Sequence, residues 1–560
     1  MSSGTQYDPG AGRAAAGGMA DSLFKNSPAA RDMNEAMGRV KALGMSPRQL
    51  ELNRRWSYYT ATQYDNRRLN WNGRERADPI DHEAIASAGF LPPGYYDAGE
   101  SMPIEFRRPT VAYHLVRVIV NRFTSLLFSE SQSPRLHVDG DQDTEDFVSA
   151  MIESAGLWPA MIMARTHGGA TGTSCIGFQF LAGKPVVEVH DPRWIIPVFE
   201  DRATWRLKSI EIKYQYPVER MDRETGEWEE VMYWYRRIID DTSDTLFRGI
   251  PVGDGTMPLF WPEERAVVHG LGFCPVVWIQ NIPVQDDADG EPDVWGIYEL
   301  VEGIDAQLSQ CHKGTLANAD PTLLIKTASE LGSLRKGSEN AIKLPGPGDD
   351  ARYMEIGGAG LKMALDLAGQ LRSYALEVAQ CVLDHPDTAS RTATEIERVY
   401  SSMLSKADIM REQYGQRGVR VLVEMMIAAA RKLSMPRAEA GGIVRGEIKL
   451  PMKIVRHDDG IIEQVPHRLG NGGTVQLKWG PYFAPSVSDA QAAAAAAGAA
   501  KGAGILGDEE AAKYIAPFFK VEDAQAMIGR IREQAATQEA ALMASMGGGG
   551  FGGAPALPEE

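Results

Sequence analysis

The segment VWGIYELVEGIDAQLSQCHKGTLANAD, residues 294–320, decides which fold this chain can adopt. Its apolar residues recur every three or four positions from Val294 to Leu308, which places them on one face of a helix. The pattern stops at Asp320-Pro321, because proline cannot continue a helix. A helix of about 24 residues is roughly 36 Å long. The segment therefore predicts one long helix with a single apolar face.

A second amphipathic stretch, LKMALDLAGQLRSYALEVAQCVLDHP, covers residues 361–386. The same spacing predicts a helix that ends at His385-Pro386. Between the two helices, short β-rich runs occur at 322–326, 341–344 and 352–356. We expect them to form a small insertion of two or three strands between two long helices.

The polar turn Asp387–Thr392 follows the second helix and leads into a third helical pattern, from Ile396 to Ala407. A further strongly apolar helix is predicted over 419–433. This run of helix, strands, helix, turn and helix contains no recognisable arrangement of catalytic residues. We interpret it as a scaffold.

The N-terminal part reads as an arm followed by helices. Residues 1–45 are rich in Gly, Ala and Ser, which predicts a mobile segment. Ser46-Pro47 is a good helix start. The following basic and aromatic residues, from Arg54 to Arg76, have the composition for base stacking, but we favour aromatic rings packed inward with arginines that are solvated or salt-bridged. Helices are also predicted over 109–128, 144–154 and 158–168.

Residues 172–283 are rich in β-branched and aromatic residues. The runs Ile176–Phe180 and Ile210–Tyr216 alternate in the manner of half-buried strands, and Asp222–Trp228 predicts a hairpin turn. This region predicts an antiparallel sheet subdomain. Downstream, strands are expected at 448–455 and 474–479 and helices at 488–501, from Gly504 onward and at 521–546, before a Gly-rich tail.

Length and charge limit the classes of protein to which the chain can belong. With 560 residues it is too long for one compact core, so two to four domains are expected. Its net charge of −17 argues against a protein that coats nucleic acid. The charge remains compatible with a protein that surrounds DNA and lets it slide, because strong basic contacts would hold the DNA in place.

Cysteine usage and hydropathy indicate a cytoplasmic site of synthesis. The four cysteines lie far apart and form no Cys-x-x-Cys pair, so we expect reduced thiols and neither a disulfide framework nor a structural zinc site. No apolar run approaches the roughly 20 residues that span a bilayer. The N-terminus has no continuous apolar core, which argues against a secretory signal.

The sequence lacks the familiar motifs of catalytic, phosphate-binding and metal-binding sites. The sequence has no phosphate-binding loop, no Gly-x-Ser-x-Gly elbow and no His-Glu-x-x-His zinc helix. His385 and His457 stand beside aspartates, but adjacent residues point in different directions and do not form a metal triad. Asp286–Glu291 is similar to part of a calcium loop, although Ile297 stands where that loop needs glutamate. We expect no cofactor, no metal and no enzyme.

The order of these elements resembles the portal proteins, the head-to-tail connectors of tailed double-stranded-DNA bacteriophages. The resemblance covers roughly residues 46–535 and depends on order and length more than on any sharp motif. It is carried by five segments: Trp56-Ser-Tyr-Tyr59, Asn121–Phe128 before Pro134, the helix 294–310, the strands 341–344 and 352–356, and Gly504–Glu510 with Pro517. The loop 387–392 departs from the family because it lacks a glycine, and 491–500 is unusually rich in alanine.

The resemblance implies an α+β portal fold with long stem helices, an antiparallel β-rich wing, a small α/β clip and a helical C-terminal crown. The segments it implies are a flexible arm (1–45), wing (46–290), first stem helix (291–320), clip (321–356), second stem helix (357–385), tunnel loop (386–392), wing again (393–485), crown (486–546) and a disordered tail (547–560).

The resemblance also implies a function in a virion. Portals form rings, typically of twelve subunits, at one capsid vertex, and DNA enters and leaves through the central channel. The implied partners are the DNA, the terminase large subunit, adaptor or head-completion proteins, and the major capsid and scaffolding proteins, with no membrane. Assembly would take place in the host cytoplasm.

The candidate DNA-facing residues fall into two groups. The resemblance makes Thr388, Ala389, Ser390 and Arg391 the pore-facing residues of the tunnel loop. Cations near the clip and stem are candidates for transient contact with DNA, although each also suits a solvated or inter-subunit salt bridge. These cations are Lys313, Lys326, Arg335, Lys336, Lys343 and Lys362.

Two other functions remain open. A hydrolase or transferase would use the β-rich region 172–283, with His190, Asp191 or His269 as its active residues. Another virion structural protein, such as a minor capsid or tail component, would share the composition and the absence of motifs. A ring with an axial hole distinguishes the portal from the enzyme, and position at one vertex beside the terminase distinguishes it from other virion proteins.

Overall fold

A computed structural model of the chain describes residues 46–64, 109, 111–129, 132–221, 226, 228–252, 258–319, 322–326, 350–354, 358–383, 398, 400–434, 437–439, 442–444, 448–456, 462–472, 474–482 and 487–516, with isolated positions between 528 and 537. The chain divides into two compact units. Unit 1 comprises Met1–Val382 with Ser405–Gly480, and unit 2 comprises Leu383–Leu404 with Pro481–Glu560. Helices and antiparallel strands both contribute, so the predicted α+β class is confirmed.

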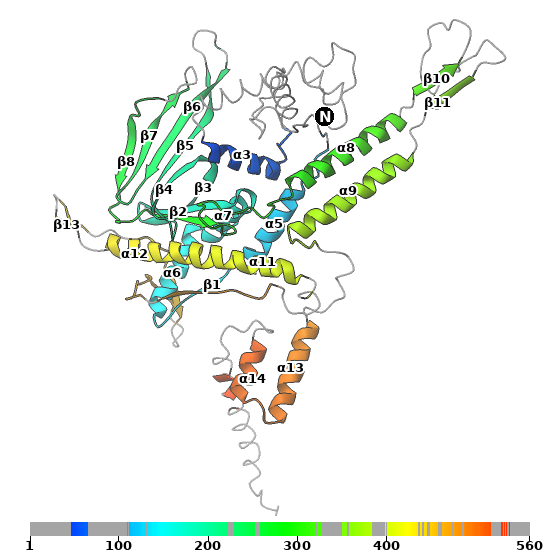
Figure 1. Ribbon diagram of the computed structural model, residues 1–560. Helices are drawn as coiled ribbons and strands as arrows, with labels where there is room; N and C mark the ends of the chain where they lie inside the picture. The colour runs from blue at the N-terminus through cyan, green and yellow to red at the C-terminus, as the bar shows by residue number, and fades with distance from the viewer. Residues whose placement is uncertain are drawn as a thin grey trace, which may run out of the picture. The chain divides into compact units, whose positions relative to one another are not determined.

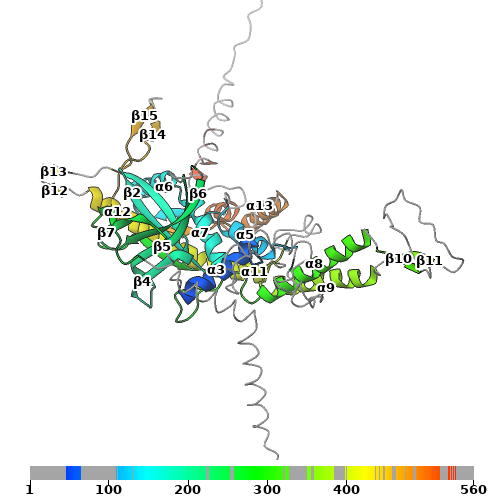
Figure 2. The same cartoon turned by 90° about the horizontal axis from the view of Figure 1, so that it is seen from above.

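Two long helices form an antiparallel hairpin in unit 1. Helix α8 (Tyr298–Ala319) leads into strand β10 (Thr322–Lys326), which pairs with β11 (Asp350–Met354) before helix α9 (Gly358–Val378) returns. Figures 1 and 2 show this pair of helices extending away from the sheets, with the two-stranded ribbon at its far end. The predicted helices and two of the predicted strands are therefore confirmed, with β11 two residues earlier than the expected 352–356, and the predicted strand 341–344 lies outside the described residues.

Both helices are shorter than their apolar patterns. Residues 294–297 form a turn, and α8 begins at Tyr298. Helix α9 ends at Val378 and not at the predicted His385-Pro386. Gln380 adopts a left-handed φ of 53°, and the amide N–H of Cys381 donates to the carbonyl of Leu376, which closes the helix C-terminus early. The helix therefore ends at a left-handed C-cap several residues before the proline.

The N-terminal helices start from caps that the sequence reveals only in part. Helix α3 (Pro47–Thr60) begins with a capping box between Ser46 and Gln49, as Ser46-Pro47 predicted. Helix α5 (Leu115–Leu127) begins six residues later than Pro109, because His114 has a left-handed φ of 57° and cannot continue a helix. Helices α6 (Gln142–Ala155) and α7 (Leu157–Thr171) follow as predicted.

The β-rich region forms two antiparallel sheets, where the sequence predicted a single one. One sheet has the order β3-β2-β9, with β2 (Thr173–Leu181), β3 (Lys184–His190) and β9 (Val276–Gln280). The other has the order β4-β5-β6-β7-β8. Its strands are β4 (Ile195–Asp201), β5 (Arg206–Met221), β6 (Trp228–Ile239), β7 (Ser243–Pro251) and β8 (Glu263–Val268), and the short 3-10 helix η2 (Pro192–Trp194) joins the two sheets.

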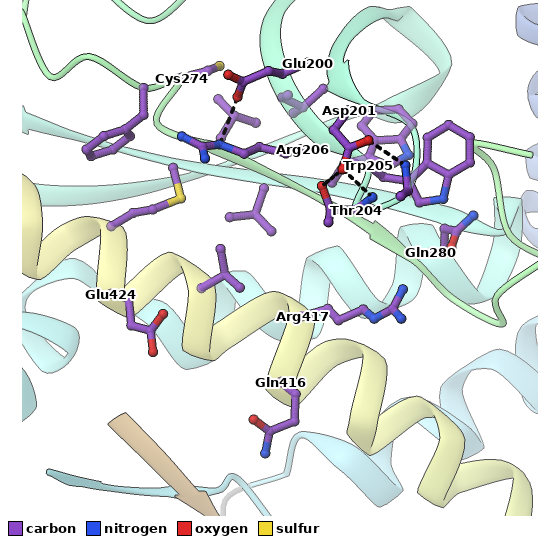
Figure 3. A pocket seen from close by; sticks show the side chains of 18 of the residues that line it. Glu200, Asp201, Thr204, Trp205, Arg206, Cys274, Gln280, Gln416, Arg417 and Glu424 are labelled. Atoms are coloured by element: carbon purple, nitrogen blue, oxygen red, sulfur yellow. Dashed lines mark hydrogen bonds and ion pairs between the residues drawn. The ribbon is translucent and has the colours of Figure 1, made fainter. Parts of the chain in front are cut away.

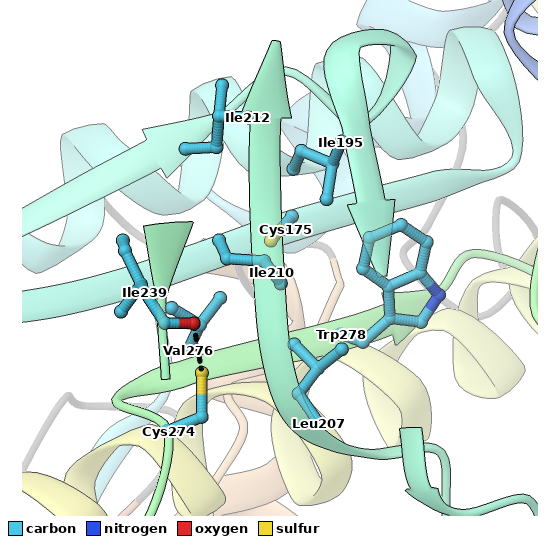
Figure 4. Packing of buried hydrophobic residues seen from close by; sticks show 9 residues of the cluster. All are labelled: Cys175, Ile195, Leu207, Ile210, Ile212, Ile239, Cys274, Val276 and Trp278. Atoms are coloured by element: carbon cyan, nitrogen blue, oxygen red, sulfur yellow. Dashed lines mark hydrogen bonds between the residues drawn. The ribbon is translucent and has the colours of Figure 1, made fainter. Parts of the chain in front are cut away.

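Apolar side chains of both sheets share one core. Figure 4 shows Ile195, Ile210 and Ile239 of the five-stranded sheet close to Cys175 and Trp278 of the three-stranded one. Burying such side chains stabilises the fold by about 1.5–3 kcal/mol each. The four cysteines are free and buried, and burial raises the pKa of the Cys274 thiol to about 12.

One long helix crosses beneath the sheets. It consists of α11 (Ser401–Arg411), the π-helical segment η4 (Glu412–Arg420) and α12 (Val421–Ser434). The sequence predicted two separate helices here, from Ile396 to Ala407 and over 419–433, whereas the structure has one continuous helix from Ser401 to Ser434. A Cβ at Gly418 would lie 2.7 Å from Ile279, so this glycine lets the helix approach β9 closely.

Short ribbons and a second helical unit complete the described chain. Strand β1 (Arg135–Val138) pairs with β16 (Val475–Lys478), which confirms the predicted strand at 474–479. Small hairpins form from β12 (Arg437–Glu439) with β13 (Gly442–Val444) and from β14 (Lys453–Arg456) with β15 (Ile462–Val465). The prediction of a strand from 448 was too long, since β14 begins at Lys453. In unit 2, α13 (Val487–Gly502) and α14 (Asp508–Ile515) confirm two predicted helices.

Among the described residues, no single helix has the length and apolar character needed to cross a membrane, and α6 with α7, bent by 63°, meets that criterion only as a pair. The predicted helix 521–546 lies largely outside the described residues.

Candidate functional site

The hairpin α8–α9 is the candidate site, and its two helices are in register along their whole length. A Cβ at Gly303 would lie 3.3 Å from Leu371, and one at Gly314 would lie 2.5 Å from Leu361. The strand pair Thr322↔Met354 continues the same antiparallel register. From one pair to the next, the chain advances along α8 and β10 by nearly as many residues as it moves back along α9 and β11. The helices and the ribbon therefore form one continuous hairpin. Glycines on α8 let α9 approach closely.

Acidic side chains of α8 hold the base of the hairpin against the body. Asp305 accepts hydrogen bonds from the Tyr113 amide N–H at 2.8 Å and from the Tyr64 hydroxyl at 3.1 Å. The hydroxyl of Tyr58 donates to the Glu302 carboxylate. On the other helix, Arg372 Nε donates to the Tyr113 hydroxyl at 2.9 Å. The segment around Tyr113 thus contacts both helices, and the base cannot move without breaking these bonds.

Burial gives Asp305 an unusual protonation equilibrium. Desolvation raises the pKa of its carboxyl above the usual value, while the bond from the Tyr113 amide opposes that shift. The hydroxyl of Tyr64 is similarly affected, because burial and the nearby Asp305 charge raise its pKa.

A buried ion pair lies where the hairpin joins the body. Arg165 of α7 and Asp293, just before α8, are fully buried, and Arg165 Nη2 donates to Asp293 Oδ2 at 2.8 Å. Asn281 Nδ2 donates to the other carboxylate oxygen at 2.9 Å. The ring of Tyr414 lies beneath the guanidinium, and its hydroxyl donates to Asn281 Oδ1 at 3.1 Å. The start of α8 is therefore joined to α7 and to the long helix.

A second cation, the half-buried Lys406, joins both ends of the hairpin to the long helix. Lys406 Nζ donates to the carbonyl of Asp293 at 2.8 Å and to that of Ala379 at 2.9 Å. The first carbonyl precedes α8 and the second follows α9. Burial lowers the pKa of Lys406, while the Asp293 charge opposes that shift. Lys406 therefore binds the chain at both ends of the hairpin.

Helix α9 carries an exposed apolar stripe. One face of the helix carries four exposed apolar side chains. They are Met363, Leu367, Tyr374 and Val378, with exposed fractions of 71%, 41%, 54% and 53%. Steps of four and seven residues keep these side chains within one face of the helix. The opposite face packs on α8 through Leu361, Ala368 and Ala375. An apolar stripe of this length on a protruding helix is typical of a protein–protein contact.

Three of the predicted basic residues lie on the hairpin. Lys313 on α8 and Lys362 on α9 are exposed, and the Gly314–Leu361 approach places them at the same level. Lys326 is exposed at the end of β10. The hairpin thus brings these three cations to its outer half. Arg335, Lys336 and Lys343 lie outside the described residues, as do Thr388, Ala389, Ser390 and Arg391.

The sequence did not point to the residues that fix the hairpin. Arg165, Asp293 and Lys406 are far apart in the chain, and none stands in a motif. The one local signal is a charged residue inside an apolar helical pattern, as at Arg165 in Met161–Ala170, because a charge there needs a partner.

A groove in the body is a separate feature. It encloses about 920 Å³ between η4–α12 on one side and the β4–β5 turn with β9 on the other. Figure 3 shows Gln416, Arg417 and Glu424 on the helix, facing Trp205 of the β4–β5 turn, Arg206 of β5 and Gln280 of β9. Trp205 has a left-handed φ of 53°, which is rare for an aromatic residue.

The residues of the alternative hydrolase do not come together in that groove. His190 is buried at the end of β3, and burial lowers its pKa to about 4. Asp191 caps η2 and pairs with Arg193 at 2.6 Å. His269 follows β8 and accepts a hydrogen bond from the Leu271 amide at 3.2 Å. None of the three lines the groove.

The acidic run Asp286–Glu291 has a structural role. Asp289 pairs with Arg48, whose Nη2 lies 2.8 Å from Asp289 Oδ1, and it also accepts from the Thr173 hydroxyl at 2.8 Å. In the part of the chain that the structure describes, no group of three or more His, Cys, Asp or Glu side chains is placed to hold a metal ion.

No family model and no curated protein matches this chain. Among solved structures, it is similar to a chain in the virion of a native gene transfer agent (GTA) particle, with 14% identity and a TM-score of 0.28 over 63% of this chain and 80% of that one. It is also similar to chains in the neck of an empty GTA particle computed with C6 symmetry (15% identity, TM-score 0.35, 77% and 92% covered) and in the neck of a native GTA particle computed with C12 symmetry (14%, 0.34, 78% and 93%).

Proposed function

We propose that this chain is a virion structural protein of a phage-like particle, and specifically a portal protein that assembles into a ring around DNA. The observation that carries the proposal is the hairpin α8–α9. It is a long, continuous helical pair, fixed at its base by buried polar contacts, and most of α9 is exposed.

The exposed stripe on α9 explains why such a hairpin would assemble. A single copy leaves Met363, Leu367 and Tyr374 in water, which costs free energy that a neighbouring hairpin would recover. Repeating one contact around an axis closes a ring. In that ring the α8–α9 pairs form the channel wall, and Lys313, Lys326 and Lys362 are the cations proposed to contact DNA transiently.

The partners and location follow from the same proposal. DNA passes through the channel, the terminase large subunit docks at the ribbon end during packaging, and adaptor or head-completion proteins replace it. The capsid and scaffolding proteins surround the ring at one vertex of the virion. The work is geometric and not enzymatic, and twelve copies is the expected number.

Negative-stain imaging of the purified chain tests the proposal. Ring particles with an axial hole are expected across a range of salt concentrations. A stable monomer at high protein concentration, with no ring in any salt, would overturn it. Rings that locate away from the packaging vertex in assembled particles would favour another virion structural protein.

A further inference from the structure

We infer that the groove between η4–α12 and the β4–β5 turn is the docking site of the chain's own N-terminal segment, which binds through the apolar residues of 32–43. The inference stands apart from the proposed ring, because the groove and the segment belong to one copy of the chain.

The groove is lined by apolar side chains on both sides. Trp205, Phe273 and Trp278 line it from the side of the sheets, and Val421 and Met425 line it from the long helix. Val421 is exposed, so its side chain is in water unless a further segment covers it. An apolar groove of this size beside a helix is typical of sites that accept a helical peptide segment.

The described chain begins beside this groove. Ser46 is the N-cap of α3, and the guanidinium carbon of Arg48 in the first turn lies 5.2 Å from the ring centroid of Trp278. Trp278 is one of the residues that line the groove. The residues that precede Ser46 therefore join the folded body next to it, which makes them the nearest candidate to fill it.

One stretch of the N-terminal segment has an apolar face. The spacing of three or four residues in 32–43 predicts a helix with its larger apolar side chains together, unlike the Gly- and Ala-rich stretch before it. These side chains are Met33, Met37, Val40 and Leu43. Methionine adapts to irregular apolar surfaces. So short a helix is marginal in water, and its apolar face needs a surface to be stable.

The lengths of the groove and the segment agree. A helix over residues 32–43 is about 18 Å long. The helical wall of the groove runs from Gln413 to Ala428, which is about 23 Å. The groove therefore has room for the whole apolar face of the segment.

The charges on the rim suit a segment that carries both signs. Glu200 pairs with Arg206 at 3.1 Å, and Glu424 pairs with an arginine outside the groove at 2.9 Å. Asp201 and Arg417 (Figure 3) have no oppositely charged partner among the described residues, so the rim offers one free charge of each sign. Residues 32–43 carry two acidic and two basic side chains. The rim thus does not exclude this segment, and the apolar face and the position select it.

Cross-linking in the full chain tests where the segment docks. Met37→Cys with Val421→Cys adds one thiol to the segment and one to the groove, while the four native cysteines are buried. A short bismaleimide should join positions 37 and 421 within one chain, as detected by mass spectrometry of the tryptic digest. Met37→Cys with Ile409→Cys is the matched control, because Ile409 is exposed on the same long helix but outside the groove. Its yield should be at most about one fifth.

Trypsin cleavage tests the same contact without new thiols. Val421→Glu places a charge on the apolar wall, so the segment should detach, while the exposed position leaves the fold intact. Cleavage after Arg39 and Lys41 should then be about fivefold faster than in the wild type, because it follows the population of the detached state. The control Ile409→Glu should change this rate less than about twofold. Both variants should keep the melting temperature of the wild type.

Equal cross-linking yields at positions 421 and 409, or equal cleavage rates in the two glutamate variants, would overturn the inference. Cross-links that join isotope-labelled to unlabelled chains in a mixed sample would also overturn it, since the segment of a second copy would then be the occupant. Rings without the intrachain cross-link would overturn this inference and leave the proposed function standing. The intrachain cross-link in a chain that never forms rings would do the reverse.

Discussion

Arg165 and Asp293 show how much a single buried contact can control in this chain. Both side chains have no solvent exposure, and they join α7 to the start of α8. Removing one partner leaves an uncompensated charge in the interior, whereas removing both leaves none. The geometry of the hairpin base therefore depends on a pair of residues 128 positions apart in sequence.

Arg165→Met should lower the free energy of unfolding by about 3–5 kcal/mol. Adding Asp293→Asn should cost less than the sum of the two single changes, because the carboxylate is then no longer charged and unpaired. Urea unfolding followed by circular dichroism measures both. The control Arg420→Met breaks an exposed pair with Glu424 and should cost about 0.5 kcal/mol or less. Similar losses for Arg165 and Arg420 would contradict a dominant buried pair.

Asp305 predicts a dependence on pH. Its folded-state pKa is raised by burial, so the folded state binds the proton more tightly than the unfolded state does. Stability from this group is fully present below its unfolded pKa of about 3.9 and is lost as the pH rises through the raised folded value. The free energy of unfolding of the wild type, relative to Asp305→Asn, should therefore increase as the pH is lowered through that window.

Asp141 provides the opposite case as a control. The Thr144 amide N–H is the main cause that lowers the pKa of its carboxyl. The wild type should therefore lose stability relative to Asp141→Asn as the pH falls below the unfolded value. If the stability difference between the wild type and the variant changed with pH in the same direction for Asp305→Asn and Asp141→Asn, burial would not be the cause of the raised pKa of Asp305.

At the scale of elements, the apolar spacing of residues 294–320 and 361–386 was enough to predict two helices and the strands between them. It was not enough to predict where they end. The C-terminus of α9 depends on the left-handed Gln380 and on Lys406, which binds the carbonyl of Ala379 from another helix. A helix end that depends on a contact from a distant segment cannot be predicted from the local spacing of apolar residues.

The exposed stripe on α9 should drive assembly without supporting the fold of one copy. Leu367→Glu combined with Tyr374→Glu should leave the thermal stability of the subunit within about 0.5 kcal/mol, because both side chains are exposed. The same change should abolish rings, as seen by size-exclusion chromatography and negative stain. Ser373→Glu, exposed on another flank of α9, is the control and should assemble normally. Rings from the double variant would remove the stripe from the proposed contact.

At the scale of the whole molecule, the chain forms two units, and it passes from one unit to the other three times along the sequence. Unit 1 contains the hairpin and both sheets, while α13 and α14 belong to unit 2. Length predicted several domains but not this division, because residues 405–480 return to unit 1 through the long helix and the β1–β16 pair. The finer division into wing, stem, clip and crown stays a prediction of the resemblance.

The loop that follows α9 carries a prediction about the assembled ring. Replacing Arg391 with Glu should impair packaging or retention of DNA, because it reverses a charge expected to face the channel, while rings still form. Packaging yield in an infected or reconstituted system, with ring images of the same protein, measures both effects. A matched Arg391→Lys variant should package normally. Normal packaging by the Glu variant would remove the loop from the candidate residues.

The sequence by itself determined which segments become helix or strand, since periodicity and caps such as Ser46 act over a few residues. It also determined the acidic charge and the absence of familiar catalytic motifs. Only the tertiary structure decided the register of the hairpin, the burial of Arg165 with Asp293 and the groove beside Arg417. Each of these depends on close approach between distant segments, for example where Gly418 admits Ile279. Local patterns report the face that a side chain occupies, and packing alone decides what lies against it.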